Sequence, residues 1–264
     1  MAEKMQNRLA YFLLKKVNKA LYAYQMIENG DRVVVAVSGG KDSLTLLRLL
    51  QLAMRTIPVA FDLVAVHVES DFQCTECGHR ETLERLFRNE GFEYSFEQIQ
   101  VTIGEDGKGR TPDCFWCSWN RRKTLFLTAQ RLRCNKIAFG HHADDVAETT
   151  LLNLFYHGRL ETMKPKVRFF GGKITVIRPL VFVPEKEIAR YAKACRFPSY
   201  TCRCPNSFTS KRARMKEILK TVERVCPKVK ANLLKAIENE MAVVSNEGAE
   251  VTPNIHPSTT PLSR

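Results

Sequence analysis

Apolar residues recur at helical spacing near the start of the chain, from about Leu9 to Ile27, with lysines and an arginine at the intervening positions. This pattern predicts an amphipathic helix that ends at Asn29-Gly30-Asp31. A continuous β-branched run follows from Arg32 to Val37, which is typical of a strand buried on both faces in a parallel sheet. A glycine-containing turn and a second helical pattern, which starts at Leu44, come next.

Strand and helix patterns then alternate along the chain. We expect strands at Asp62–Val68, Glu93–Val101 and Lys136–Phe139, helices at Arg80–Asn89, Cys117–Leu132 and Val146–Tyr156, a hairpin at Val167–Ile177 and a helix at Pro184–Ala194. Such alternation predicts an α/β fold built on an open parallel sheet of about five strands with helices on both faces.

The patterns divide the chain into four parts. We expect an amphipathic helix in residues 1–30, the α/β domain in 31–200, a basic helical region in 201–244 and a flexible tail rich in Pro, Ser and Thr in 245–264. The sequence contains no internal repeat.

The positive net charge of the chain indicates which kinds of partner it binds. Lys and Arg total 41 against 28 acidic residues, a formal net charge of +13, and nine Lys or Arg face two Glu between Arg203 and Lys230. A surface this basic favours phosphate, nucleic acid or an anionic membrane. No apolar run approaches the roughly 20 residues that span a bilayer, and Lys15 and Lys16 interrupt the N-terminal apolar stretch. We therefore expect a cytoplasmic protein that does not enter a membrane.

The hexapeptide Ser38-Gly39-Gly40-Lys41-Asp42-Ser43 lies between the first strand and the next helix. Glycines at such a turn let backbone N–H groups approach an anion, and the helix N-terminus adds partial positive charge. Lys41 and the two serine hydroxyls supply further donors. The spacing fits neither a Walker A loop nor a dinucleotide fingerprint, so a P-loop NTPase is disfavoured. The alternative is a glycine-rich turn without a ligand.

A second polar stretch, Gly140-His141-His142-Ala143-Asp144-Asp145, follows the fourth predicted strand. Ligands of open α/β sheets gather beyond the carboxyl ends of the strands, where the strand order reverses. We therefore expect the loops after the first and fourth strands to flank one crevice, with carboxylates suited to Mg²⁺. Alternatively, Asp144 or Asp145 caps the following helix, and both roles are compatible.

Nine cysteines, in a protein expected to stay reduced, favour metal ligands over disulfides. Cys114 and Cys117 stand one turn apart at the start of a helix that continues into Asn120-Arg121-Arg122-Lys123. That setting favours thiolates, and paired thiolates select zinc or an iron–sulfur cluster. A late cysteine would complete a three-thiolate site with one open iron. We take the isolated Cys134, Cys195 and Cys226 as packing residues.

The glycine-rich hexapeptide resembles the PP-loop of ATP pyrophosphatases, which split ATP into AMP and pyrophosphate while they activate an oxygen of a second substrate. Residues 31–200 would then be a PP-loop ATPase domain. The resemblance implies that Asp42 arranges Mg²⁺ or the triphosphate, and that His67, at the end of the second strand, lies by the adenosine. It implies a nucleotide site made of Ser38, Gly39, Gly40, Lys41, Asp42, Ser43, His67, Gly140 and Asp145.

The order of SGGKDS, a C-x-x-C before a basic helix, GHHADD and a late cysteine resembles the TtcA-type tRNA 2-thiocytidine synthetases, over about Leu9 to Glu240. The resemblance implies ATP, Mg²⁺ and a 4Fe-4S cluster as cofactors, and catalytic roles for Lys41, Asp42, Cys114 and Cys117. It implies that the C2 oxygen of a base is adenylated and that sulfur from the cluster then replaces it at C2. The base would be a cytidine in the anticodon loop. The implied partners are tRNA and a sulfur donor such as a cysteine desulfurase or free sulfide. Whether the protein forms a homodimer is left open.

The resemblance implies that Cys114, Cys117 and one downstream cysteine bind the cluster. Of Cys202 and Cys204 we favour Cys204, because it precedes a proline, as in uridine-modifying relatives. Cys74 and Cys77 depart from the resemblance. Three roles are open for them: they complete a four-thiolate zinc site with Cys114 and Cys117, they relay sulfur as a persulfide, or they lie in a solvent-facing loop and have no function.

Three other functions stay open. The chain could be a thiouridine synthetase of the same group, a zinc-stabilised tRNA-binding PP-loop protein without sulfur transfer, or a lysidine-type ligase, which would not need the cysteines. We expect the basic helices around Lys211 to Lys230 to hold tRNA phosphates, and Trp116 and Trp119 to pack in the core more readily than to stack on bases.

Overall fold

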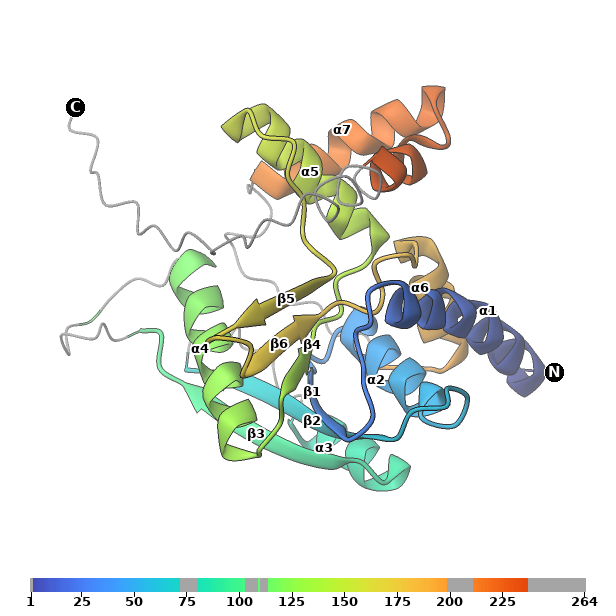
Figure 1. Ribbon diagram of the computed structural model, residues 1–264. Helices are drawn as coiled ribbons and strands as arrows, with labels where there is room; N and C mark the ends of the chain where they lie inside the picture. The colour runs from blue at the N-terminus through green and yellow to red at the C-terminus, as the bar shows by residue number, and fades with distance from the viewer. Residues whose placement is uncertain (1, 72–79, 103–108, 110–113, 199–210, 237–264) are drawn as a thin grey trace.

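The computed structural model describes residues 2–71, 80–102, 109, 114–198 and 211–236. Its described part contains one sheet with the strand order β3-β2-β1-β4-β6-β5 (Figure 1). Neighbouring strands are parallel, except that β5 runs antiparallel to β6. The strands are β1 (Asp31–Ala36), β2 (Phe61–Ser70), β3 (Glu93–Ile99), β4 (Lys136–Ala138), β5 (Lys166–Phe169) and β6 (Ile174–Ile177).

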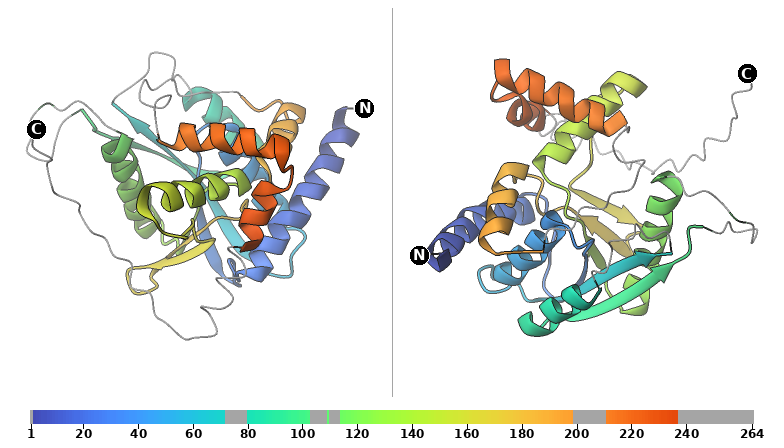
Figure 2. Two further views of the ribbon diagram at one scale, coloured as in Figure 1. Left: turned by 90° about the horizontal axis from the view of Figure 1, so that it is seen from above. Right: turned by 180° about the vertical axis from the view of Figure 1, so that it is seen from behind.

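The sheet is flanked on both faces by helices, as the alternating pattern predicts. Helices α1, α2, α3 and α6 bury their apolar residues in a core on one face of the sheet, the α2-side core, and α4 packs on the other face, the α4-side core (Figure 1). Two further helices, α5 and α7, pack against each other beyond the sheet edge (Figure 2). The helices are α1 (Ala2–Ala23), α2 (Lys41–Ala53), α3 (Arg80–Glu90), α4 (Cys114–Arg131), α5 (Ala143–His157), α6 (Glu185–Ala194) and α7 (Lys211–Val225), and residues 229–236 are also helical.

The β-branched run in β1 is buried on both sides because alternate side chains enter different cores. Val33 and Val35 lie in the α2-side core, whereas Val34 lies in the α4-side core. This is the period of two expected of a central strand.

The prediction of about five strands was low by one. Both strands of the predicted hairpin join the sheet, because β6 pairs with β4 in parallel and β5 then forms the edge. The first helix also ends earlier than expected, at Ala23 instead of Ile27. Gln25 takes a φ of +46°, and this turn directs Met26 and Ile27 into the core.

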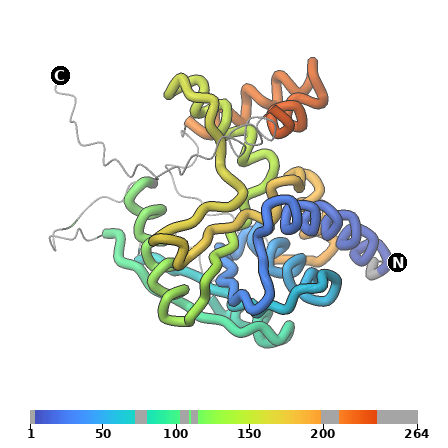
Figure 3. Tube along the Cα trace, in the orientation of Figure 1, coloured from blue at the N-terminus to red at the C-terminus, as the bar shows by residue number. Residues whose placement is uncertain are grey.

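The strand order places two loops side by side. The trace in Figure 3 runs from β1 to β2 and β3 on one side, and later returns to β4 on the other side of β1. The order therefore reverses between β1 and β4, and the loops that leave their carboxyl ends flank this point, which is where ligands of open α/β sheets bind.

Candidate functional site

The loop after β1 has an internal scaffold that leaves its backbone free to face an anion. Gly39 takes a φ of +85°, a conformation that favours glycine. The backbone N–H of Ser38 donates to Ser43 Oγ at 3.1 Å, and Ser43 Oγ donates to the carbonyl of Gly40 at 2.9 Å. Gly40 is the N-cap of α2 and no side chain in the described part of the chain caps this end, so N–H groups of the first turn stay available to phosphate oxygens.

Lys41 projects from this loop into a chain of alternating charges. Its Nζ lies 3.1 Å from the Asp42 carboxylate and 3.1 Å from Glu185 Oε1, while Lys216 Nζ of α7 donates to Glu185 Oε2 at 2.8 Å. Burial opposes ionisation of Glu185, but the hydrogen bonds from Lys216 and Lys41 outweigh it and lower the pKa of Glu185 to about 2. The pKa of Lys41 is raised, since Asp42 and Glu185 outweigh burial.

The loop after β4 packs directly on the first loop. A Cβ on Gly140 would lie 3.1 Å from the backbone nitrogen of Ser43, so only glycine allows this approach without a shift. Its neighbour His142 is buried, and His142 Nε2 lies 3.9 Å from Asp42 Oδ1. The two predicted halves of the nucleotide site therefore meet, as the strand order requires.

The capping interpretation of this second loop is confirmed for Asp145. The Asp145 carboxylate accepts from the backbone N–H of His142 at 2.9 Å, and His142 Nδ1 accepts from the backbone N–H of Asp145 at 3.3 Å. This reciprocal pair is a capping box at the start of α5. Asp144 instead accepts from the backbone N–H of Glu185 at 2.7 Å and pairs with Lys230 at 2.8 Å, and these contacts outweigh burial and lower its pKa.

The position expected for His67 was wrong in one respect, because β2 continues for three residues beyond it, to Ser70. The His67 ring is buried, and Nδ1 lies 2.7 Å from the carbonyl of Val37, directly before the phosphate loop. The ring therefore supports the end of β1. Its contact with adenosine stays a prediction.

The described acidic residues suit a magnesium ion only if phosphate completes its shell. Among the residues that the structure describes, no group of three or more His, Cys, Asp or Glu is arranged to hold a metal ion. Mg²⁺ is commonly bound by one or two carboxylates together with substrate phosphates and water. Asp42, which lies in the phosphate loop, is placed for such a site.

The two cysteines of the C-x-x-C motif stand in the first turn of α4, as predicted, although the helix begins at Cys114 and not at Cys117. Cys117 is a free, half-buried thiol that packs against the α4-side core, which also contacts Ala36 at the end of β1. Cys204, the favoured third ligand, lies outside the described residues, as do Cys202, Cys74 and Cys77. The three-thiolate site therefore stays a prediction.

Other residues singled out in the sequence have structural contacts. Cys134 lies in the α4-side core, and burial raises the pKa of its thiol. Trp116 and Trp119 stack on each other, with ring centroids 5.5 Å apart and planes 9° apart. Trp116 packs against the α4-side core, whereas Trp119 is 39% exposed and carries the Lys123 ammonium 4.8 Å above its ring.

Sequence reasoning missed the residues that connect the phosphate loop to the last helices. In the sequence Glu185 is only an acidic residue in the first turn of the predicted helix Pro184–Ala194, and Lys216 and Lys230 are only members of the basic run. Their contacts span 144, 31 and 86 residues of sequence, so no local pattern signals them.

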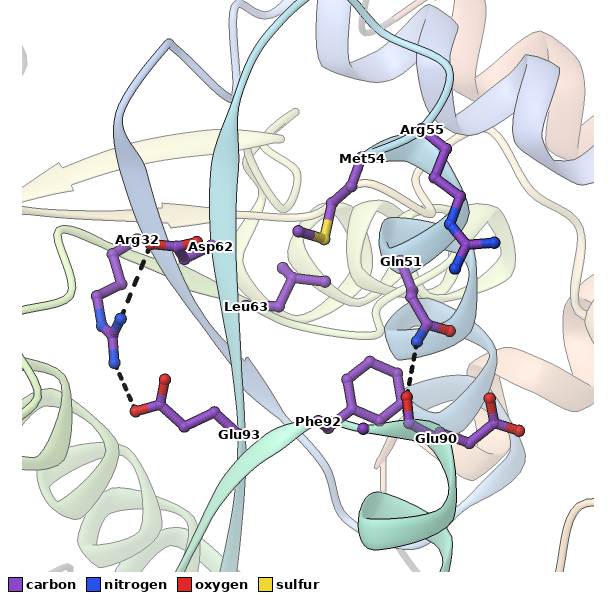
Figure 4. Close-up of a pocket in the computed structure, with 10 residues that line it drawn as sticks. Arg32, Gln51, Met54, Arg55, Asp62, Leu63, Glu90, Phe92 and Glu93 are labelled. Carbon is purple, nitrogen blue, oxygen red and sulfur yellow. Dashed lines mark hydrogen bonds and ion pairs between the residues drawn. The ribbon is translucent and has the colours of Figure 1, made fainter.

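A separate cleft of about 620 Å³ lies at the opposite, amino-terminal edge of the sheet (Figure 4). Its polar side chains are largely paired with one another, since Arg32 contacts Glu93 and Asp62, and Gln51 donates to the backbone of Glu90 (Figure 4). It shares no residue with the predicted nucleotide site.

Comparisons with known proteins agree with this geometry. A family model described as PP-loop domain matches residues 5–220. The tRNA-cytidine(32) 2-sulfurtransferase of Citrifermentans bemidjiense is 43% identical over 229 residues, 85% of this chain and 88% of its own length. The protein of the same name from Geotalea uraniireducens is 42% identical over 241 residues, 89% of this chain and 94% of its own.

Among solved structures, the U34-tRNA thiolase NcsA from Methanococcus maripaludis, with its 4Fe-4S cluster, superposes with a TM-score of 0.74 and 24% identity. The match covers 90% of this chain and 80% of the thiolase, so the two share a fold. None of the described helices is long and apolar enough to cross a membrane.

Proposed function

The chain belongs to the PP-loop family and, within it, to the ATP-dependent tRNA-cytidine(32) 2-sulfurtransferases, and on that premise we propose that it replaces the C2 oxygen of cytidine 32 in tRNA with sulfur. The observation that carries the proposal is the contact between Gly140 and Ser43, which joins the uncapped phosphate loop to the second loop at the sheet's switch point.

The first reaction is adenylation of the base. ATP lies in the loop from Ser38 to Ser43, whose N–H groups, hydroxyls and Lys41 hold the phosphates. The C2 oxygen attacks the α-phosphate, the bond to the β-phosphate breaks, and pyrophosphate leaves. Positive groups fixed around the departing charge lower the barrier because they need no reorganisation. Lys41 must exchange its contact with Glu185 for one with phosphate.

Asp42 is our candidate for binding the Mg²⁺ that accompanies ATP. Its carboxylate stands between Lys41 and His142, so it faces the side of the loop where the second loop approaches. Asp42 would hold the ion beside the ATP phosphates, where its charge would offset that of the triphosphate.

The sulfur site is proposed on α4. Cys114, Cys117 and Cys204 would hold a 4Fe-4S cluster, to which two thiols in the first turn of one helix are suited. When bound, such a cluster supplies an open iron that carries sulfide for the exchange with AMP at C2. Cys117 contributes by its position, because it packs against the core that lies under the ends of β1 and β4.

The remaining partners follow from charge and chemistry. We propose that the basic side chains of α7 contact tRNA phosphates, that a cysteine desulfurase or free sulfide supplies the sulfur, and that the enzyme works in the cytoplasm. Dimerisation is a further proposal that analytical ultracentrifugation can test.

The test is the loss of one nucleoside. Mass spectrometry of tRNA from a deletion strain should show no 2-thiocytidine, and a plasmid copy of the wild-type gene, but not of Lys41→Ala, should restore it. Persistence of 2-thiocytidine with loss of a 2-thiouridine would favour the thiouridine synthetase. Purified protein with one zinc and no iron would favour the RNA-binding alternative.

A further inference from the structure

Arg178 is a half-buried cation for which the residues that the structure describes provide no counter-ion. It directly follows β6, and its guanidinium donates through Nη1 to the backbone carbonyl of Lys164. Its Nε is fully buried and has no hydrogen-bond partner among the described residues. Within the described part of the chain no carboxylate pairs with Arg178, and burial, followed by the nearby positive charge of Arg122, lowers its pKa to about 10.

The two nearest described titratable neighbours of Arg178 bring no negative charge to it. Arg122 projects from α4, and His141 from the loop after β4. His141 Nδ1 is also buried, and no described group hydrogen-bonds to it. Burial, and then the charge of Arg178, lowers the pKa of His141 to about 4, so the ring is neutral at pH 7. A partly buried charge without compensation is costly, and its presence here points to an anion that supplies the compensation.

Strand alternation places this cluster on the α4 side of the sheet. Val176 lies in the α4-side core and Ile177 in the α2-side core, so Arg178 again faces α4. The His141 ring contacts Phe139, whose side chain packs against the α4-side core, as does Cys117. The unpaired guanidinium therefore stands on the same face as the proposed sulfur site.

A phosphate group matches this cluster in charge and geometry. The arginine fork donates parallel hydrogen bonds to phosphate oxygens, and a neutral imidazole adds a further N–H donor. The phosphates of ATP already have the loop before α2, where Lys41 pairs with Glu185 of α6. Arg178 stands two strands away, roughly 10 Å at about 4.8 Å per strand, and on the other face.

We propose that Arg178, Arg122 and His141 form a binding site for a backbone phosphate of the tRNA, next to the nucleotide that is modified. The inference rests on the proposed function and deepens it. The guanidinium would hold the phosphodiester on the α4 side while the base enters the crevice, so a splayed nucleotide is positioned by its backbone without being read.

The experiment measures the salt dependence of binding to an unmodified tRNA transcript by fluorescence anisotropy, with the full-length protein purified anaerobically. Loss of one phosphate contact should reduce the slope of log K against log salt by about 0.7 to 0.9. We expect this reduction, with at least tenfold weaker binding at low salt, for Arg178→Met and for Arg122→Gln. Arg85→Met, which removes an exposed arginine of α3, is the matched control and should keep the wild-type slope.

Two further measurements separate a binding role from a structural one. ATP affinity should stay within twofold of wild type in both variants. The melting temperature of free Arg178→Met should not fall below that of wild type, because the substitution removes a half-buried charge that no carboxylate of the described residues pairs with. If Arg178→Met does not fold, the slope of log K against log salt measured for the exposed Arg122→Gln variant still tests the proposal.

An unchanged slope in Arg122→Gln and Arg178→Met would overturn the inference. So would weaker ATP binding with an unchanged slope, which would assign the cluster to an ATP phosphate. Wild-type protein that does not bind the tRNA transcript at all would instead remove the proposed function, and the two failures are therefore distinguishable.

Discussion

The ammonium of Lys41, in the phosphate loop, lies 3.1 Å from the carboxylate of Glu185, the first residue of α6. The same carboxylate binds Lys216 of α7. Because one carboxylate joins both lysines, the loop that holds ATP is connected to a helix that we propose contacts tRNA. Phosphate entering the loop competes with Glu185 for Lys41.

Lys41→Ala should abolish ATP-dependent thiolation while the protein stays folded. The side chain is partly exposed and lies in neither described core, so its removal takes a positive charge from the triphosphate site and leaves Glu185 with Lys216 as its partner. We expect a rate at least 10²-fold lower, in keeping with the loss of a charge-stabilising group, and an unchanged circular dichroism spectrum. Asp42→Ala should behave in the same way. Lys186→Ala, at a neighbouring position on α6, is the control, and full activity in both loop variants would refute the assignment.

Glu185→Gln should change the dependence of stability on pH. The folded-state pKa of Glu185, about 2, lies below the ordinary value of 4.5, so its contribution is complete at neutral pH and is lost as the pH falls from about 4.5 towards 2. We expect wild type to exceed Glu185→Gln by about 3 kcal/mol in unfolding free energy at pH 7, with most of the difference lost in acid.

Chemical denaturation from pH 7 to pH 2.5 measures that difference. Glu217→Gln, which removes an exposed carboxylate of α7, should follow the wild-type curve. A constant offset between wild type and Glu185→Gln across the range would contradict the ionic origin of the effect.

Gly140→Ala should separate the two loops. The new methyl group would lie 3.1 Å from Ser43 N and 3.2 Å from the carbonyl carbon of Asp42, which are backbone atoms that cannot rotate away. Overpacking of this kind costs about 1 to 3 kcal/mol. We expect lower stability and weaker ATP binding by calorimetry. Gly109→Ala, whose Cβ would meet no atom of a described residue within 4 Å, should leave both unchanged.

Cysteine substitutions should distinguish the thiols that bind the cluster from those that do not. Cys117→Ser should lose iron and the absorbance near 400 nm, whereas Cys134→Ser should keep both, because Cys134 is a core residue. Cys204→Ser should lose the cluster and Cys202→Ser should retain it. The reverse result for the last pair would move the third ligand to Cys202. Iron analysis of anaerobically purified protein gives the answer.

The parts of the site that sequence predicts are those set by adjacent residues. SGGKDS follows a buried strand directly, and the strand carries it to the carboxyl edge. The position of Gly140 against Ser43 then follows from the order of strands, since both loops leave the same edge of neighbouring parallel strands.

The parts that sequence does not predict depend on distant contacts. The backbone N–H of Glu185 donates to Asp144 across 41 residues, and that contact helps to fix the start of α6 beside Lys41. The sixth strand was missed because a hairpin pattern does not reveal that β6 will pair with β4. Arg178 has no visible signal either, because an arginine beside an apolar strand gives no sign of its burial.

Because β5 and β6 form an antiparallel hairpin, insertions should have different effects at its two ends. The turn at Gly171 and Gly172, both at positive φ, lies at the far end of the hairpin, so added residues there would leave the strand ends in place. A single residue inserted between Val176 and Arg178 would reverse the faces of the residues after the insertion. The guanidinium would then move through the sheet to the side of α2, away from Arg122. Length variation is therefore tolerable in the turn and disruptive at the end of β6.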